Sequence, residues 1–336
     1  CTLVVLMFLG VTQGAAPVGL SEVFLLIKQS LAETTTAANS ALVPDWMGNI
    51  VWYVRSPRVV LAVLVGGTLA ICGAAMQGLL RNPLASPSVL GVSSGASLGA
   101  VFVMFMGLSA VSIWFLPLFA FIGAGLTIML VYTIASQRGH TAVGTLILAG
   151  VAVGALNVAL SSLLLAMALN NWEIGRSIIY WTMGGLEGRT WDHVLLLAPP
   201  FVVGSGLIMT YARDLDAMLL GEIHATSVGV DVADVRKKVL LITSMMIGAA
   251  VAVSGAIGFI GLVVPHILRL VFGPHHRYLL PASLFAGGIC LLGADILMQT
   301  YFPTKDVPVG VVTASMGAPF FLYLLVRQRK SLQVTL

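Results

Sequence analysis

The sequence predicts an all-α, polytopic membrane protein, and three observations lead to this prediction. Hydrophobic residues make up 58% of the 336 residues and charged residues only 9%, whereas about a quarter of a soluble domain is charged. The stretches 82–137 and 239–268 contain no Asp, Glu, Lys or Arg, and a helix needs about 20 apolar residues to cross the hydrocarbon core. The 36 glycines are dispersed along such stretches, which favours close packing between membrane helices.

Grouping the apolar runs between charged or Pro/Gly breaks predicts about ten crossings within a single membrane domain, 1–336. The first run is only about 16 residues long and looks truncated rather than like a complete signal peptide. The predicted spans are 1–17, 59–80, 88–108, 112–135, 142–169, 192–212, 235–254, 257–272, 278–301 and 307–326.

The basic residues predict which membrane face each loop occupies, because cationic loops are retained in the cytoplasm. An even number of spans places both termini on one side. If that side is the cytoplasm, eleven of the 17 Lys and Arg residues are cytoplasmic and six are external, so two cytoplasmic termini are expected. The six external ones are Lys28, Arg55, Arg58, Arg176, Arg189 and Lys305.

The sequence shows no sign of enzymatic machinery. It contains no Gly-Lys pair and therefore no P-loop, and no H-E-x-x-H zinc helix. Cys1, Cys72 and Cys290 are isolated and lack disulfide or metal-ligand spacing. The adjacent His275 and His276 are expected to be solvated in a cytoplasmic turn rather than to bind metal. We therefore expect no catalytic residue, no metal site, no cofactor bound by this chain and no nucleic-acid partner.

Two stretches, 173–190 and 213–238, are too polar to be spans. The second holds nine charged residues. Within it, Gly221 and Gly229 bracket a short predicted helix with Glu222 near its start, where a carboxylate suits the helix dipole. From the residues alone, this polar stretch, called the insert below, either docks in a groove on a partner protein or is an ordinary charged loop.

A proline- and glycine-rich segment, 81–100, leads to a family resemblance. Its prolines end one helix and pre-set the next, and its glycines recur every four residues. This segment, the insert and the run 254–270 together resemble the FecCD-type permeases, the membrane subunits of importers for ferric siderophores, haem and cobalamin. Further matching segments are Leu279-Leu-Pro281, Ala294-Asp295 and the run 308–320.

The resemblance implies an assembly in a bacterial inner membrane with ten helices per subunit. Two permeases form a homodimer around a central pathway, two ATPase subunits that carry ATP and Mg bind below, and a periplasmic substrate-binding protein docks above. The insert, about 214–230, matches the coupling helices that fit a cleft in the ATPase. The residues assigned to coupling are Leu220, Gly221, Glu222, His224, Ser227 and Gly229.

Arg55 and Arg58 are candidates for docking the binding protein. They lie three residues apart at the outer end of the second span, so they are expected to share one helical face, where permanent positive charge can meet carboxylates. Alone, they could equally be snorkelling interfacial anchors. The resemblance favours docking, and the position of a third family arginine is occupied by Gln299.

The resemblance also places the pathway and its gate. The fifth span and the turn before it, with Thr141, Ala142, Val143 and Gly144, correspond to the family's pathway lining and cytoplasmic gate. In the external segment, Arg176, Tyr180 and Met183 are assigned to the mouth of the pathway. There Arg176 could meet carboxylates of haem or a siderophore through charge-assisted bonds, while the alternative is that the segment's aromatic residues are ordinary interfacial anchors.

Asp295 is the one carboxylate predicted well inside a span. It is either a functional ionisable group or a structural hydrogen-bond hub. It is also the obvious candidate for the rival function, a secondary transporter driven by an ion gradient; a non-transporting receptor or scaffold is the third class. The favoured function is an ATP-driven importer permease for haem or a ferric siderophore, with cobalamin as the alternative cargo.

Overall fold

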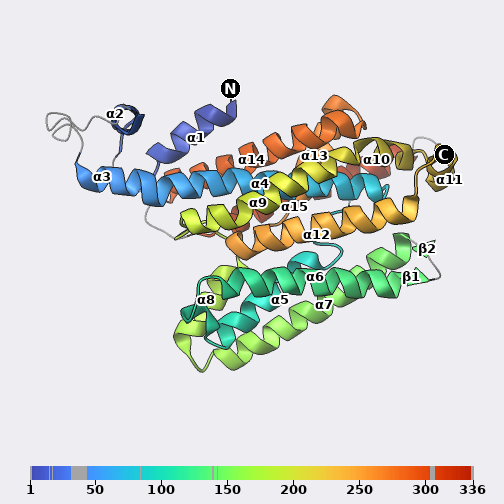
Figure 1. The fold of residues 1–336 in the computed structure, drawn as a ribbon, viewed down its shortest axis with the longest axis horizontal. Helices are drawn as coiled ribbons and strands as arrows, with labels where there is room; N and C mark the ends of the chain where they lie inside the picture. Colours follow the sequence, from blue (N-terminus) through green and yellow to red (C-terminus); the bar gives the residue numbers. More distant parts are fainter. Residues whose placement is uncertain are drawn as a thin grey trace.

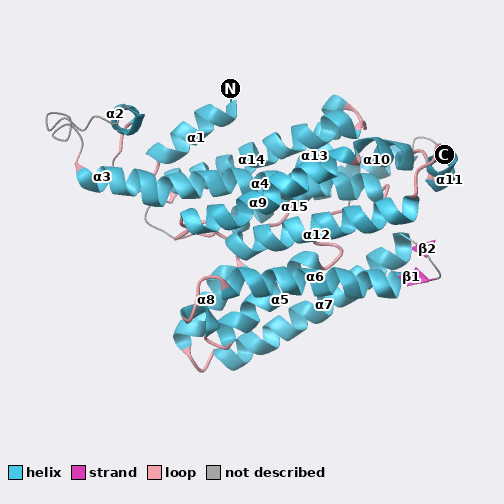
Figure 2. Cartoon of the chain, viewed as in Figure 1, coloured by secondary structure: helices cyan, strands magenta, loops and turns pink. Residues whose placement is uncertain are grey.

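The structure of the protein is a computed structural model, and almost all of the described chain is helical (Figure 1 and Figure 2). The all-α prediction is therefore confirmed. The described strands are a two-residue antiparallel pair, β1 (Ser136–Gln137) and β2 (His140–Thr141). The described residues are 2–14, 16, 18–31, 44–83, 85–137, 140–141, 143–302 and 307–333.

Within these residues, six helices are long and apolar enough to cross a membrane, and four apolar helices are shorter. Each predicted span coincides with one of these ten, because long charge-free runs can satisfy their backbone in a membrane only as helices. The number of crossings and the side of the termini stay predictions. The six are Asp45–Leu79 (α3, Asp45–Asn49; η1, Ile50–Arg55; α4, Ser56–Leu79), α6 (Phe115–Ala135), α7 (Val143–Ala168), α9 (Trp191–Thr210), α12 (Val232–Ser254) and α14 (His276–Tyr301). The shorter ones are α1 (Thr2–Thr12), α5 (Val92–Phe105), α13 (Ile260–Phe272) and α15 (Val309–Gln333), whose apolar part is Val309–Phe320.

Two of the short helices begin after irregular backbone that is covered by protein. The loop before α5 contains the buried residues Ala85 and Leu90 and ends at Gly91, whose φ is +76°. The loop before α13 begins at Gly255, with φ of +67°. Non-helical backbone at membrane depth is tolerated where protein buries it, and these two breaks shorten α5 and α13.

Helix α4 lies at the centre of the bundle. In the most apolar 18-residue stretch of the span Asp45–Leu79, 83% is buried. Its glycines allow the closest approaches. A Cβ atom on Gly66 would overlap the carbonyl oxygen of Gly287 in α14, and one on Gly73 would overlap that of Gly261 in α13. The predicted packing through small residues is therefore seen in the structure.

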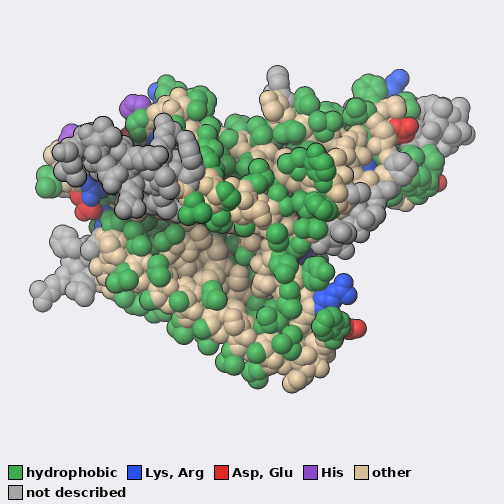
Figure 3. All heavy atoms as spheres, turned by 180° about the vertical axis from the view of Figure 1, so that it is seen from behind, with side chains coloured by type: hydrophobic (Ala, Val, Ile, Leu, Met, Phe, Trp, Pro, Cys, Tyr) green, Lys and Arg blue, Asp and Glu red, His purple; other side chains and the backbone are tan. Residues whose placement is uncertain are grey.

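Helices α6, α7 and α9 lie at the periphery. At most about a third of the most apolar 18-residue stretch of each helix is buried. Large apolar side chains such as Leu148 and Leu163 are exposed on them. Figure 3 shows hydrophobic side chains over most of the visible face, with charged side chains near the two ends of the long axis. An apolar belt between charged ends is the surface expected of a membrane-embedded protein.

The two polar stretches lie at opposite ends of the bundle (Figure 1). One end carries α8 (Trp172–Thr182), with α3 and α2 (Leu20–Leu31). The other carries α10 (Ala212–Leu219), α11 (Glu222–Ser227) and the β1–β2 turn. This separation is what the assignment of these stretches to opposite membrane faces requires. A last short element, η2 (Leu108–Ala110), links α5 to α6.

Candidate functional site

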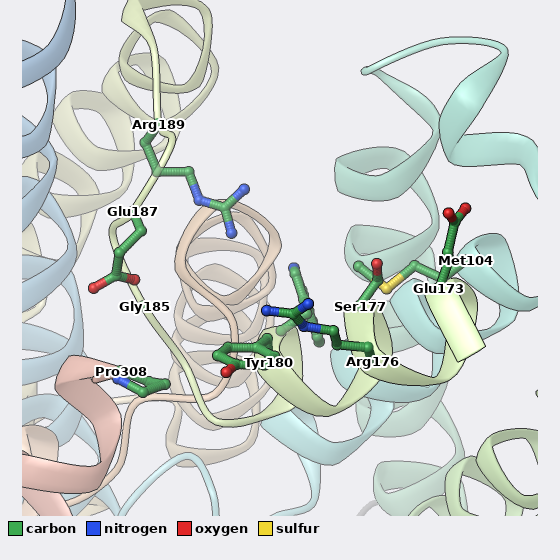
Figure 4. A pocket seen from close by; sticks show the side chains of 10 residues that line it. Met104, Glu173, Arg176, Ser177, Tyr180, Gly185, Glu187, Arg189 and Pro308 are labelled. Atoms are coloured by element: carbon green, nitrogen blue, oxygen red, sulfur yellow. The ribbon is translucent and has the colours of Figure 1, made fainter. Parts of the chain in front are cut away.

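A cavity of about 640 Å³ opens beside α8, and its lining comes from α8, the segment between α8 and α9, and the ends of neighbouring elements (Figure 4). It is the candidate site for a substrate at this end of the protein, since a cavity of this size holds a small molecule. Its lining residues are Met104, Glu173, Arg176, Ser177, Tyr180, Trp181, Gly185, Glu187, Arg189 and Pro308.

The sequence sets α8 in place locally. The Asn171 side chain accepts hydrogen bonds from the backbone N–H groups of Glu173 and Ile174, which caps the first turn. With 3.6 residues per turn, Glu173, Arg176 and Tyr180 then share the face of α8 that borders the cavity.

Two arginines point into the cavity in Figure 4. The Arg176 guanidinium lies 5.4 Å from the centre of the Tyr180 ring, a cation–π distance. The Arg189 Nε atom is buried and has no hydrogen-bond partner in the described part of the chain. Burial lowers the pKa of Arg189, and the Glu187 carboxylate opposes part of that shift. An arginine stays charged in proteins, so this site favours an anionic group.

Two carboxylates, those of Glu173 and Glu187, line the same cavity. In Figure 4 the carboxylates of Glu187 and Glu173 point away from the two guanidinium groups. Glu187 is instead paired with Arg58 of α4, at 3.3 Å. The lining therefore carries two arginines and two glutamates, and the arginines are the groups in it that can donate hydrogen bonds to a carboxylate.

Behind this cavity, Asp295 is a hydrogen-bond hub, which is one of the two roles the sequence allowed. Its side chain is fully buried and accepts bonds from Arg58 at 3.0 Å from Nε and 2.7 Å from NH2, and from Gln299 at 2.7 Å. A buried carboxylate with a bidentate arginine is already compensated, so it does not need an imported cation.

The expected outward-facing pair of docking arginines is not seen. Arg55 is 5% exposed and donates hydrogen bonds to the carbonyl oxygens of Val11 and Thr12, which the end of α1 leaves unpaired, and to that of Ala16 beyond it. Arg58 turns to α14. The two guanidinium groups therefore reach different partners, at the end of α1 for Arg55 and in α14 for Arg58. Docking by Arg55, Arg58 and Gln299 stays a prediction.

The other predicted pathway residues are divided between the two ends. Arg176 and Tyr180 line the cavity, while Met183 does not and is 43% exposed. The predicted gate lies at the far end of α7, roughly 39 Å along a helix of 26 residues. There Thr141 belongs to β2, Val143 and Gly144 begin α7, and Ala142 lies outside the described residues.

At that far end, α11 forms as predicted between Gly221 and Gly229, whose φ angles of +116° and +90° suit glycine. Glu222 begins the helix and pairs with Arg236 of α12 at 2.5 Å, with the Arg236 side chain only 4% exposed. Of the other predicted coupling residues, His224 accepts a bond from Ser227 at 2.7 Å through its carbonyl oxygen. Glu222 therefore anchors the insert to a membrane helix.

The insert presents apolar side chains to its surroundings. Ile223 is 90% exposed, Leu220 71% and Val228 59%. Exposed apolar side chains grouped on an otherwise polar element mark a surface for another protein. Leu220 was predicted for coupling, whereas the sequence analysis missed Ile223 and Val228; their apolar character within a charged stretch was the available signal.

The prediction that His276 is solvated is wrong. This side chain is fully buried, and its backbone N–H and Nδ1 lie 2.8 and 2.7 Å from Asp216 Oδ1. Burial raises the pKa of Asp216, but the hydrogen bonds from His276 outweigh it and hold the pKa below its usual value. The pair ties α10 to the first residue of α14, so the insert is connected to two membrane helices, α12 and α14.

Comparison with known proteins identifies the family. The model of the FecCD transport family matches residues 2–327. The chain belongs to the FecCD transport family. This FecCD chain is 46% identical over 283 residues to the cobalamin import system permease protein BtuC of Halobacterium salinarum, covering 84% of this chain and 75% of that protein.

Two further relatives of the FecCD chain carry other substrate names. It is 40% identical over 302 residues to the hemin transport system permease protein HmuU of Yersinia pestis, covering 88% of this chain and 87% of that one. It is also 40% identical over 294 residues to the Fe(3+) dicitrate transport system permease protein FecD of Escherichia coli, covering 86% and 90%.

A solved structure titled as an inward-facing conformation of a metal-chelate type ABC transporter shares the fold of the FecCD chain. The TM-score is 0.78 at 30% sequence identity, over 91% of this chain and 97% of the other. The family resemblance inferred from the sequence is confirmed.

Proposed function

We propose that this chain is the membrane-spanning permease subunit of an ATP-driven importer that carries an iron chelate, haem or a ferric siderophore, across a bacterial inner membrane. Membership of the FecCD family supports the transport role, and the names of the relatives supply the class of cargo. The observation that carries the proposal is the presence in one chain of an arginine-lined cavity at one end and an insert with exposed apolar side chains at the other.

The insert is the proposed docking site for an ATPase subunit. Its exposed Ile223 and Leu220 fit a groove on a partner protein. The Glu222–Arg236 and Asp216–His276 contacts connect the insert to α12 and α14. Movement of the ATPase would therefore reach the membrane helices through contacts that join elements of one rigid bundle.

The arginine-lined cavity beside α8 is the proposed entry site for cargo. Arg176 and Arg189 can donate charge-assisted hydrogen bonds to carboxylates of haem or a siderophore. This favours an anionic chelate, and cobalamin is the alternative cargo because a cobalamin permease is among the relatives. The complete importer would be a homodimer with two ATPase subunits, which bind ATP and Mg, and a substrate-binding protein above the cavity.

A secondary transporter is the alternative from another class. It would need a titratable or ion-coordinating group along the pathway. The one candidate named from the sequence, Asp295, is buried against Arg58 and Gln299. This arrangement favours the ATP-driven importer.

ATP-driven uptake into proteoliposomes tests the proposal. The chain is reconstituted with its ATPase and binding-protein partners, and haemin, ferric citrate and vitamin B12 are each offered outside with ATP and Mg on the ATPase side. We expect uptake of an iron chelate that needs ATP and survives collapse of ion gradients. Uptake that persists without the ATPase and stops when the gradients collapse would favour the secondary transporter.

A further inference from the structure

Helix α2, Leu20–Leu31, runs in a different direction from the predicted spans. Figure 1 shows α2 almost end-on, whereas α4, α12 and α14 run along the long axis of the picture. The axis of α2 therefore lies across the spans and close to the plane of the membrane. A helix in this orientation lies in the membrane–water interface when one of its free faces is apolar.

The contacts of α2 place it at the level where a neighbouring predicted span ends on the external side. The side chains of Val23 and Leu26 are buried in a small apolar cluster with Val51 of η1. The next residue, Trp52, accepts at its carbonyl oxygen a hydrogen bond of 2.8 Å from the indole N–H of Trp191. Trp191 is the first residue of α9 and is 37% exposed. Because tryptophan at the end of a span marks the membrane boundary, α2 lies at that boundary.

Two apolar faces of α2 have different surroundings. Successive residues of a helix are about 100° apart, so Val23 and Leu26 lie within about 60° of each other and form the packed face. Leu20 and Phe24 are about 40° apart, and their face points about a quarter of a turn away from the packed one. Leu20 is 57% exposed and Phe24 is 68% exposed. The described chain therefore leaves this second face largely uncovered.

The direction of the uncovered face follows from how α2 is packed. The packed face points sideways, toward η1 and the bundle. On a helix lying in the membrane plane, a face about a quarter of a turn away points along the bilayer normal, either into lipid or into water. Glu22 lies about 160° around the helix from Phe24 and points the opposite way. Because burying a charge in hydrocarbon is costly and burying a phenyl ring is favourable, Phe24 faces the lipid and Glu22 faces the water.

The side chains beside this face also suit a lipid surface. Lys28 is exposed and follows Phe24 by about one helical turn. Its apolar stem can lie along the lipid while its ammonium group reaches a lipid phosphate. Tyr53, two residues after Val51, is 66% exposed, as an aromatic residue at a membrane boundary is expected to be. An apolar stripe bordered by a lysine is the pattern of a helix that binds a membrane surface.

We propose that α2 is an in-plane membrane anchor, in which Leu20 and Phe24 insert among the lipid chains of the outer leaflet and Lys28 binds lipid phosphates. The ligand is the bilayer itself, because the uncovered face lies at the membrane boundary and points along the bilayer normal, opposite Glu22. The packed face of α2 contacts the ends of α1 and η1, so the anchor holds these ends at the boundary. This role goes beyond the proposed transport function and is the same for any cargo.

Spin-label accessibility tests the anchor in the complex of permease and ATPase, reconstituted in liposomes of phosphatidylethanolamine and phosphatidylglycerol. Cys1→Ser and Cys290→Ser remove two thiols, and Cys72 is retained because it is fully buried. A nitroxide is attached at Phe24→Cys, and at Glu22→Cys as the matched control two residues away. Collisions of the nitroxide with oxygen report on lipid, and collisions with a polar nickel chelate report on water.

We expect the ratio of oxygen to nickel collisions to be at least roughly fivefold higher at position 24 than at position 22, because hydrocarbon dissolves oxygen and excludes the polar chelate. A nitroxide at Leu20→Cys should match position 24, since both residues lie on the same face. Ratios at positions 20 and 24 that equal the ratio at position 22 would overturn the proposal.

Two further results would assign the uncovered face to a protein and would also overturn the anchor. Protection of position 24 from both colliders would show that a second copy of the chain covers it. Nickel collisions at position 24 that disappear only when the substrate-binding protein is added would show a protein-docking surface. Each of these results leaves the proposed transport function intact, because that function is tested separately by ATP-driven uptake in the same liposomes.

Discussion

Replacing Asp295 by asparagine tests the buried charge network most sharply. The Asp295 carboxylate is fully buried and receives three hydrogen bonds from Arg58 and one from Gln299. Removing one partner of a buried ion pair costs roughly 3–5 kcal/mol, because the other charge is left uncompensated. Arg58 is 19% exposed and keeps Glu187 at 3.3 Å, so we expect about 3 kcal/mol for Asp295→Asn, at the low end of that range.

The assay is the fraction of purified, detergent-solubilised protein that stays monodisperse after heating. The apparent Tm of Asp295→Asn should fall on the order of 5 °C. Asp192→Asn is the control, because that carboxylate is exposed; its effect should stay within about 0.5 kcal/mol. The double variant Arg58→Leu with Asp295→Leu should recover much of the loss, since apolar replacement of a buried pair is often neutral. The reasoning is refuted if Asp295→Asn is as stable as the wild type, or if the double variant is the least stable.

Four other changes have defined outcomes. Arg189→Gln should raise the KM for an anionic chelate roughly tenfold, by loss of a charge-assisted bond, and leave the KM for vitamin B12 unchanged; equal effects on both would contradict the charge-based role. Ile223→Asp should abolish ATP-driven uptake while the variant elutes and melts as the wild type does, because the residue is 90% exposed. Asp216→Asn should lower the free energy of unfolding by about 1–2 kcal/mol. This stability difference between wild type and variant should be present above about pH 4 and lost as the pH falls through the lowered pKa of the Asp216 carboxylate. A stability difference that grows in acid would refute this. Gly66→Val should prevent the accumulation of folded protein, because its side chain would overlap backbone of α14; normal expression would show that the helices can separate.

The sequence was informative about segments and poorly informative about pairings. The apolar runs marked the positions of the ten apolar helices, because charge-free stretches of that length have few other folds. The glycines bracketing α11 also predicted its start. In contrast, Arg58 and Asp295 are 237 residues apart, and no local pattern indicates that they meet.

The misplaced residues have specific physical causes. Arg55 was expected at a surface, but its guanidinium donates hydrogen bonds to carbonyl groups in the last turn of α1. His276 was expected in solvent, but Asp216 accepts its hydrogen bonds and α4 leaves space for its ring at Gly78. The place of Arg189 in the cavity beside α8 depends on how α8 packs on α5 and α7, a tertiary arrangement that spacing along the chain does not encode.

The central claim is that the insert formed by α10 and α11 seats the ATPase that drives transport. Its most direct test is disulfide cross-linking in the assembled, transporting complex, with Ile223→Cys in the insert. The matched position is Val111→Cys, which is exposed between η2 and α6 in a loop that the predicted topology places on the external face. The account predicts that position 223 cross-links to a cysteine in the ATPase groove and that position 111 does not. A complex that transports with position 223 unreactive toward the ATPase, or with position 111 cross-linked to it, would contradict the account.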